Sequence, residues 1–207
     1  MKIATIIGAR PQFIKSSIVS MEFRKSNVIE EFLIHTGQHF DENMSDIFFN
    51  EMNVDPPKYN LGINSLNHGA MTGRQLEEIE KVLIKEKPDW VLVYGDTNST
   101  IAGALAGAKL NIKIAHIEAG LRSYNRGMPE EINRILTDHA SDLLFVPTKT
   151  AKNNLIKEGI AQEKIKNVGD VMYDAAFYFE AIADKNSSIL KDQNLPKKEF
   201  NLCTVHR

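Results

Sequence analysis

Short apolar runs alternate with longer amphipathic segments along most of this chain. The runs are nearly unbroken and rich in β-branched residues, which is typical of strands covered on both faces. They predict strands at residues 2–8, 31–36, 90–94, 113–117, 143–147 and 200–205. Helical spacing or clustered small residues predict a helix that begins near Pro11 and helices at residues 41–50, 69–86, 102–108, 130–140, 149–158 and 171–183. The alternation predicts an α/β fold with a doubly wound parallel sheet and right-handed crossovers.

The pattern changes near the end of the chain. Residues 184–198 are polar, with many Asn, Ser and Lys and with Pro196, and such a composition predicts a connection between domains. We therefore expect residues 1–183 to form one Rossmann-like domain. Residues 199–207 are expected to begin a second domain, of which the chain contains only the start.

The composition of the chain limits which partners it is expected to bind and which cell compartment it is expected to occupy. The chain has 207 residues, 43% of them apolar and 25% charged, with a formal net charge of −2. The basic residues are scattered, so neither nucleic acid nor a membrane surface is an expected partner. The single cysteine, Cys203, excludes an internal disulfide and fits a reducing compartment. Because the sequence shows neither a signal peptide nor an apolar run of about 20 residues, we expect a cytoplasmic protein.

The first strand leads into a candidate anion site. Gly8 is followed by Arg10, Pro11 and Lys15, and proline suits the first turn of a helix, whose free amides favour anions. Lys15 lies one turn into the helix, where its side chain can lean back toward the same point. A phosphate site is one interpretation. Surface charge near a helix cap is the other, because neither a Walker lysine spacing nor a G-x-G-x-x-G motif is present.

Two carboxylates follow the carboxyl ends of predicted strands. Asp96 comes after the strand at 90–94, and Glu118 comes after the strand at 113–117. Ligands of open α/β sheets bind outside these ends, so we expect both side chains to face one crevice with Arg10 and Lys15. Asp96 could equally cap the next helix. Glu130 and Glu131 begin another helix, and its dipole explains at least one of them without any function.

Two histidines raise the question of a metal. His35 and His39 are four residues apart, a spacing that suits metal ligands on a helix. The strand pattern before Gly37 argues against a helix, and no third ligand is evident. We therefore interpret this segment as a polar loop at a strand end and expect no metal site.

Six motifs, taken together, resemble a known family. Residues 116–134 are the densest of these regions, with a histidine, three arginines and three glutamates. The chain closely resembles the non-hydrolysing UDP-N-acetylglucosamine 2-epimerases. The motifs are Gly-Ala-Arg-Pro-Gln-Phe-Ile-Lys at 8–15, Thr-Gly-Gln-His at 36–39, Gly-Asp-Thr at 95–97, His-Ile-Glu-Ala-Gly-Leu-Arg at 116–122, Pro-Glu-Glu-Ile-Asn-Arg at 129–134 and Val-His-Arg at 205–207.

The resemblance implies both a fold and a reaction. Members have two Rossmann-like domains in the glycosyltransferase-B arrangement, with the sugar nucleotide between them, so this chain would be the N-terminal domain. They invert C2 of a UDP-linked acetamido sugar by eliminating UDP and adding it back. No organic cofactor or metal is implied. Full-length members are commonly homodimers.

The resemblance also implies roles for particular residues. Asp96, Glu118 and Glu130 fall on the family's catalytic carboxylates, and we expect two of them to serve opposite faces of C2 while the third assists. Arg10 and Lys15 fall on its UDP-sugar contacts.

Four further residues follow from the same motifs. His206 falls among the UDP-sugar contacts, and we expect it to be catalytic. Gln38, His39 and Arg122 are expected to bind the substrate.

Some stretches leave the substrate open. Residues 37–41, 44–48 and 168–172 look more like a branch that acts on UDP-2,3-diacetamido-2,3-dideoxyglucuronate. Arg74 falls where the family has a regulatory arginine, but residues 40–43 differ from those of members that the substrate activates. A sugar-nucleotide transferase of the same architecture and a non-catalytic UDP-sugar-binding domain are the remaining alternatives.

Overall fold

The structure is a computed structural model that describes residues 1–38, 55–196 and 199–205. The predicted helix at 41–50 and the candidate residues His39 and His206 lie outside the described residues.

Seven parallel strands form one sheet in the described part of the chain, in the order β3-β2-β1-β4-β5-β6-β7. Their bounds are β1 Lys2–Ile7, β2 Glu30–His35, β3 Tyr59–Asn60, β4 Trp90–Tyr94, β5 Lys113–Ile117, β6 Leu143–Val146 and β7 Ile165–Asn167. The predicted fold class, a doubly wound parallel sheet, is confirmed.

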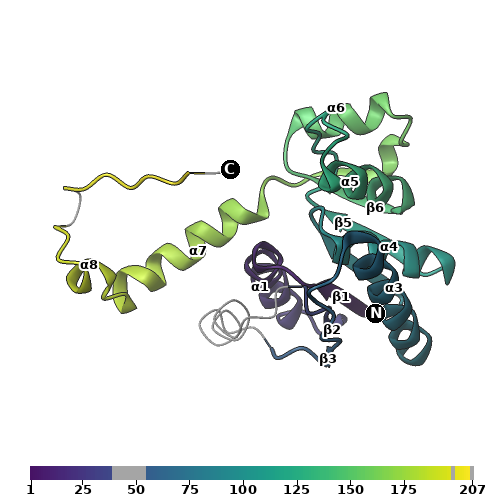
Figure 1. The fold of residues 1–207 in the computed structure, drawn as a ribbon, viewed down its shortest axis with the longest axis horizontal. Coiled ribbons are helices and arrows are strands. Elements are labelled where there is room, and N and C mark those ends of the chain that lie inside the picture. The colour runs from purple at the N-terminus through teal and green to yellow at the C-terminus, as the bar shows by residue number, and fades with distance from the viewer. Residues whose placement is uncertain (39–54, 197–198, 206–207) are drawn as a thin grey trace.

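Helices connect the strands and cover both faces of the sheet (Figure 1). Their bounds are α1 Arg10–Arg24, α3 His68–Glu86, α4 Asn98–Lys109, α5 Pro129–Ala140, α6 Lys149–Lys157, the short 3₁₀ helix η1 Gln162–Lys164, α7 Val171–Asn186 and α8 Ile189–Asp192. Most of these agree with the predicted segments within a few residues. The helix predicted at 171–183 continues to Asn186, and α8 lies in the segment predicted as a connection.

The two faces of the sheet bury separate sets of side chains. On one face, Ile3 and Ile7 of β1 pack in a cluster with Phe13 of α1. On the other face, Ala4 and Ile6 pack in a cluster with residues of α3 and α4. Successive side chains of a strand point to opposite faces, so an unbroken apolar strand serves both clusters. This explains why the runs in the sequence do not alternate.

Small residues bring α4 very close to the sheet. A Cβ atom at Gly103 would lie 2.6 Å from Cδ1 of Ile6, and one at Gly107 would lie 3.1 Å from Cγ2 of Val91. These glycines therefore permit the close packing of the helix on the sheet.

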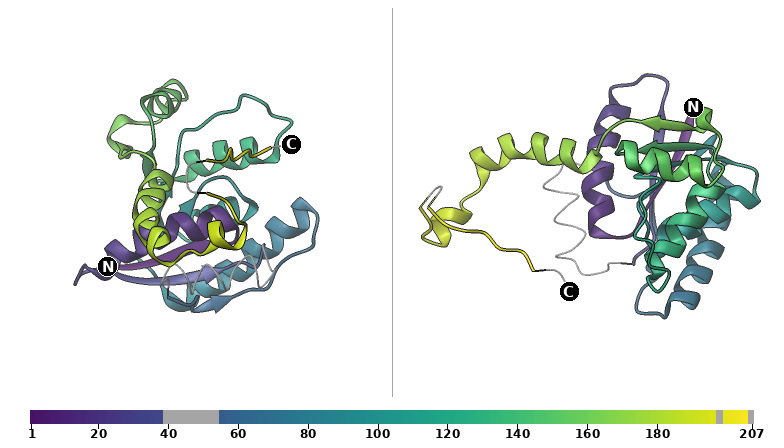
Figure 2. Two further views of the ribbon diagram at one scale, coloured as in Figure 1. Left: turned by 90° about the vertical axis from the view of Figure 1, so that its left-hand side faces the viewer. Right: turned by 90° about the horizontal axis from the view of Figure 1, so that it is seen from above.

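The last part of the described chain leaves the sheet. Helix α7 contacts α1 at its beginning and then runs outward, so that α8 and residues 199–205 lie away from the sheet (Figure 2). The strand predicted at 200–205 is wrong, because these residues form no strand and a strand requires a hydrogen-bonding neighbour. None of the described helices is long and apolar enough to cross a membrane.

Candidate active site

The crevice of this sheet lies where the winding direction reverses. β1 pairs with both β2 and β4, so the chain continues from β1 toward one edge of the sheet and from β4 toward the other. At such a switch point, the loops after two neighbouring strands separate and leave room for a ligand. Here the loops that begin α1 and α4 form that opening.

Gln12 ties the two loops together. Its Oε1 accepts hydrogen bonds from the backbone amides of Gly8, at 2.8 Å, and Ala9, at 3.0 Å. Its Nε2 donates to the carbonyl oxygen of Tyr94, at 2.7 Å, and to Oγ1 of Thr100, at 2.9 Å. The side chain is 2% exposed. Gln12 therefore fixes the distance between the end of β1 and the end of β4.

A second contact brings the β2 loop to the same place. Oγ1 of Thr36 lies 2.8 Å from Oγ of Ser99, which in turn donates to Oε1 of Gln38 at 2.9 Å. Gly8 makes this approach possible, because a Cβ atom there would lie 2.1 Å from Oγ1 of Thr36. The expected substrate-binding residue Gln38 is thereby held at the beginning of α4.

The structure separates the roles of Asp96 and Thr97. Thr97 is the N-cap of α4, and its side chain accepts a hydrogen bond from the amide of Thr100. Asp96 instead forms an ion pair with Arg134 of α5, and its carbonyl oxygen accepts from Nδ2 of Asn133 at 2.9 Å. The carboxylate of Asp96 is therefore not used to cap the helix.

The two glutamates at the start of α5 also differ. Glu131 is 1% exposed and accepts hydrogen bonds from the amides of Ser123 and Tyr124, each at 2.9 Å, and from Arg134 at 2.6 Å. Burial raises the pKa of Glu131, but these hydrogen bonds outweigh burial and hold the pKa below its ordinary value. Glu131 is thus the structural member of the pair, and the catalytic role expected of Glu130 stays a prediction.

Asp96 and Glu130 line the same pocket of about 220 Å³. The pocket lies between the beginnings of α1, α3, α4 and α5. Its lining residues are Ala9, Pro11, Gln38, His68, Asp96, Thr97, Asn98, Pro129, Glu130 and Asn133. The structure thus brings together two of the three carboxylates that the sequence singles out, along with Gln38.

Glu118 lies beside Lys15 rather than in that pocket. The two side chains form an ion pair, although α1 and the end of β5 are far apart in the sequence. A Cβ atom at Gly95 would lie 3.2 Å from Oε2 of Glu118 and 3.9 Å from Nζ of Lys15, so the pair adjoins the loop that carries Asp96. Glu118 also has a φ of 73°, a left-handed conformation that costs a non-glycine residue about 1–3 kcal/mol.

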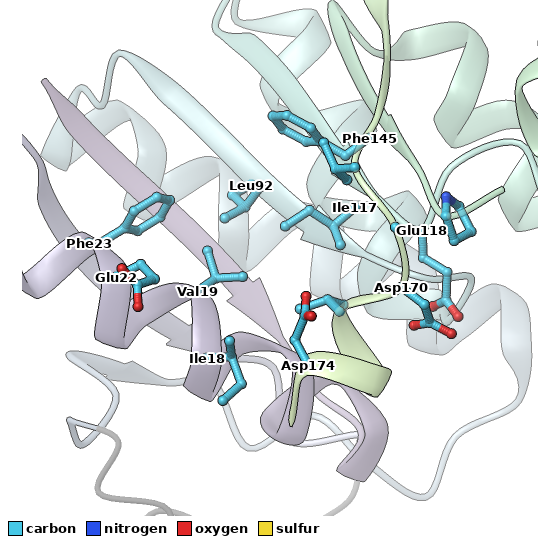
Figure 3. A pocket seen from close by; sticks show the side chains of 14 residues that line it. Ile18, Val19, Glu22, Phe23, Leu92, Ile117, Glu118, Phe145, Asp170 and Asp174 are labelled. Atoms are coloured by element: carbon cyan, nitrogen blue, oxygen red, sulfur yellow. The ribbon is translucent and has the colours of Figure 1, made fainter. Parts of the chain in front are cut away.

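Glu118 borders a second cavity, of about 310 Å³, on the face of the sheet that α1 and α7 cover. Figure 3 shows its apolar floor of sheet and α1 side chains, with Asp170, the N-cap of α7, near Glu118 and Asp174 of α7 toward α1. The expectation that Asp96 and Glu118 face one crevice is therefore met only in part, since in this structure they border adjacent cavities.

Arg122 and Arg10 have different surroundings. The side chain of Arg122 is 1% exposed and forms ion pairs with Asp138, at 2.8 Å, and Glu158, at 2.7 Å. Its guanidinium thus contacts protein carboxylates, and its expected contact with substrate stays a prediction. Arg10 is the first residue of α1 and is exposed.

His35 falls in the strand predicted at 31–36, and its side chain is buried. His35 ends β2 and lies against the ring of Phe13, with 5.1 Å between ring centroids. In the part of the chain that the structure describes, no group of three His, Cys, Asp or Glu side chains could hold a metal ion.

Sequence reasoning missed several residues at this site. Gln12, His68, Asn133 and Arg134 organise or line the pocket. Asn133 and Arg134 belong to the motif at 129–134, so their place in it was an available signal. Gln12 likewise belongs to the motif at 8–15, whereas His68 carries no such signal, because contacts across a fold have no pattern in the sequence.

The fold and this arrangement of groups define a class. A doubly wound α/β domain holds carboxylates, a lysine and helix N-termini at its switch point, as expected for a domain that binds a nucleotide-linked substrate. The family model for UDP-N-acetylglucosamine 2-epimerase matches residues 21–207. The chain belongs to this family.

Individual relatives match this chain over its full length. A UDP-N-acetylglucosamine 2-epimerase homolog of Methanococcus maripaludis is 61% identical over 100% of this chain and 57% of its own length. A UDP-2,3-diacetamido-2,3-dideoxy-D-glucuronate 2-epimerase of Pseudomonas aeruginosa is 56% identical over 100% of this chain and 58% of its own. The chain thus spans little more than half the length of these relatives.

Solved structures agree with the fold. The UDP-GlcNAc 2-epimerase of Methanocaldococcus jannaschii, in complex with UDP-GlcNAc and UDP, matches with a TM-score of 0.91 and 54% identity, over 94% of this chain and 53% of that one. A lipopolysaccharide outer core galactosyltransferase shares the fold alone, with a TM-score of 0.54 and 18% identity, over 82% of this chain and 45% of that one. Both likenesses fit the expected N-terminal domain of a glycosyltransferase-B type fold.

Proposed function

We propose that the whole protein is an epimerase that inverts C2 of a UDP-linked acetamido sugar, UDP-N-acetylglucosamine first of all. A base removes the C2 proton while the bond from C1 to the diphosphate oxygen breaks, which releases UDP and leaves a glycal. UDP then adds back to C1, and an acid returns a proton to the other face of C2. The observation that carries this proposal is that Asp96 and Glu130 border one pocket in a chain of this family.

The departing diphosphate needs positive charge nearby. Helices α1 and α4 begin at the crevice, and the free amides at a helix N-terminus favour an anion. Lys15, 7% exposed, adds a charge from within α1, and we propose that Arg10 contacts the UDP from the first residue of that helix. These groups would support UDP as it leaves and returns.

The ion pairs suggest a division of labour. Asp96 is paired with Arg134 and Glu118 with Lys15, whereas Glu130 has no ion-pair partner among the described residues. We propose that Glu130 and Asp96, which border one pocket, serve the two faces of C2. Glu118 would assist by holding Lys15 toward the diphosphate. The further contacts expected of Gln38, His39, Arg122 and His206 belong to the same proposal.

The diacetamido uronate is the second candidate substrate. It is favoured by the 56% identity to the Pseudomonas aeruginosa relative that is named for it. The 61% identical relative is named for UDP-N-acetylglucosamine. Both sugars present an acetamido group at C2, so the chemistry proposed for the carboxylates is the same for either.

The first test is NMR of UDP-N-acetylglucosamine in heavy water with the full-length protein. Inversion at C2 with incorporation of solvent deuterium supports the proposal. Absence of both would call for the diacetamido uronate in the same assay. No exchange with either sugar would contradict the proposal and favour a sugar transferase or a binding domain.

Matched variants connect the reaction to the pocket. We expect Glu130→Gln to lower kcat by about 100-fold or more, as is typical when a positioned proton-transfer group is lost. Glu163→Gln, which removes an exposed carboxylate in η1, should leave kcat unchanged. Equal rates for the two variants would remove Glu130 from the mechanism.

Two features of the whole protein are also proposals. We propose a cytoplasmic location, supported by the single cysteine and its fit to a reducing compartment. We further propose that the full-length protein is a homodimer, which analytical ultracentrifugation would test.

A further inference from the structure

His116 belongs to the densest motif of the sequence, but the proposed reaction gives it no role. It lies in β5 and is 0% exposed. Its Nδ1 lies 2.7 Å from Oδ1 of Asp138, and its Nε2 lies 2.8 Å from the carbonyl oxygen of Gly95. Both ring nitrogens therefore face oxygen atoms at hydrogen-bond distance.

These contacts define the protonation of the ring. The carbonyl oxygen of Gly95 can only accept, so Nε2 of His116 must carry a proton. The guanidinium of Arg122, which is always charged, pairs with Oδ2 of Asp138 at 2.8 Å, and the amide of Gly120 donates to the same oxygen at 3.1 Å; both contacts favour the ionised carboxylate over a protonated one. Nδ1 must then donate as well. His116 is an imidazolium inside the fold, and its charge is balanced by Asp138.

The pKa of Asp138 agrees with this arrangement. Burial raises the pKa of the carboxyl group, but the hydrogen bond and charge of His116 and the charge of Arg122 outweigh it, and the pKa lies below its ordinary value. Arg122 also pairs with Glu158. Along the series His116, Asp138, Arg122 and Glu158, positive and negative charges therefore alternate.

The imidazolium joins the two turns that carry the candidate carboxylates. On one side it holds the carbonyl of Gly95, a residue with a φ of 64° directly before Asp96. On the other side it holds Asp138, which anchors the amide of Gly120, two residues after Glu118. A backbone hydrogen bond from the amide of Gly95 to the carbonyl oxygen of Ile117, at 3.0 Å, also joins these turns, and His116 adds the side-chain link between them.

We propose that His116 is a positioning residue for the epimerase reaction: as an imidazolium clamped between Gly95 and Asp138, it fixes the turns that carry Asp96 and Glu118. The inference rests on the proposed function. Buried ion pairs are a poor source of net stability, so the retention of charge here points to a demand for geometry. His116 itself contacts none of the groups proposed to meet the substrate.

The protonation can be measured without any activity. We expect ¹⁵N NMR of the full-length protein at neutral pH to show protons on both ring nitrogens of His116. In Asp138→Asn, the new amide can donate to Nδ1, so the ring should become neutral, with its proton kept on Nε2 toward Gly95. A neutral ring in the unmodified protein would overturn the proposal.

Kinetic measurements distinguish a role of His116 in positioning the carboxylates from a role in stabilising the fold alone. His116→Asn can replace only one of the two hydrogen bonds, and a misplaced catalytic group commonly costs about 100-fold in rate. We therefore expect kcat to fall by about 100-fold with KM changed less than about threefold. Asp138→Asn keeps the hydrogen bond to Gly95 and should lose less than about tenfold.

The control is a variant that destabilises the fold far from the crevice. Leu83 is 1% exposed near the end of α3, 15 residues along the helix from His68, which lines the crevice, and Leu83→Ala should lower thermal stability without lowering kcat. If folded His116→Asn keeps its kcat within about threefold, the proposal is wrong. If the unmodified enzyme does not epimerise, the proposed function fails, and the NMR measurement still tests the clamp.

Discussion

Glu130 and Glu131 are adjacent in the sequence, but their environments differ completely. Glu131→Gln would replace a carboxylate that three donors share. We expect a loss of about 1–3 kcal/mol in the free energy of unfolding, because an amide nitrogen would face backbone donors. Glu130→Gln should cost less than about 1 kcal/mol, the contribution of a charge at a helix N-terminus. Urea unfolding measures both, and equal losses would contradict this assignment.

The contribution of Glu131 also depends on pH. Its pKa in the folded chain lies below the ordinary value of 4.5, so the folded state binds the proton more weakly than the unfolded state. The stabilisation is complete at neutral pH and is lost as the pH falls from 4.5 through the folded-state pKa. The glutamine variant should lose this part of the acid sensitivity.

Glu31 presents the opposite case. Burial raises its pKa above 4.5 despite a hydrogen bond from Thr5. The folded state therefore holds the proton more tightly, and ionisation at neutral pH costs stability. We expect Glu31→Gln to increase the urea midpoint at about pH 7 and to lose that advantage near pH 4. The neighbouring exposed Glu30 provides the control, since Glu30→Gln should show no gain at either pH.

At the residue scale, the sequence predicts chemical types better than individual roles. It leaves Asp96 open between capping and chemistry, and it gives Glu130 and Glu131 as helix-dipole partners without deciding between them. The decision depends on tertiary contacts: Arg134 pairs with Asp96, and the loop amides before α5 bind Glu131. Such contacts are absent from any local pattern.

At the scale of elements, two glycines in helices should respond oppositely to alanine. Gly73 lies in α3 with no heavy atom within 4 Å of an added Cβ, so Gly73→Ala should stabilise the chain by about 0.4–1 kcal/mol. Gly103 lies in α4, where the Cβ would approach Ile6 to 2.6 Å, and Gly103→Ala should cost about 1–3 kcal/mol. Thermal unfolding of both variants would test the close packing of α4, which a gain for Gly103→Ala would contradict.

Elements were predictable in proportion to their burial. β4 and β5 match their predicted ranges because they are central strands with apolar side chains on both faces. β3 and β7 have two and three residues, too few for a periodic signal. The wrong strand at 200–205 shows the converse, since an apolar pattern cannot supply the neighbour that a strand requires.

At the scale of the whole molecule, the expected second domain would form the other side of the crevice. The chain covers 57% of the Methanococcus maripaludis relative. We expect the 207-residue chain by itself to fold, to bind UDP weakly and not to epimerise a UDP-sugar. Calorimetry with UDP, and the deuterium assay with this chain alone, would check this. Robust epimerisation would contradict it.

Charge variants sharpen the binding measurement. Lys15→Ala should abolish the weak UDP binding, because it removes the buried ammonium that lies in α1 beside Glu118. Lys81→Ala, whose side chain is 58% exposed on α3, should bind UDP as the parent does.

The contact of Gln12 with the end of β4 has a consequence for the order in which the protein is made. Gln12 and Tyr94 are 82 residues apart in the sequence. Gln12 comes shortly after β1 and Tyr94 ends β4, and these two strands are neighbours in the sheet. During synthesis, β1 and β2 emerge early, but β4, the other strand that pairs with β1, emerges much later. The crevice can assemble only after β4 and the start of α4 have left the ribosome. Until then, the backbone N–H and C=O groups on that edge of β1 have no partner strand. Nascent chains are most open to misassociation at this stage.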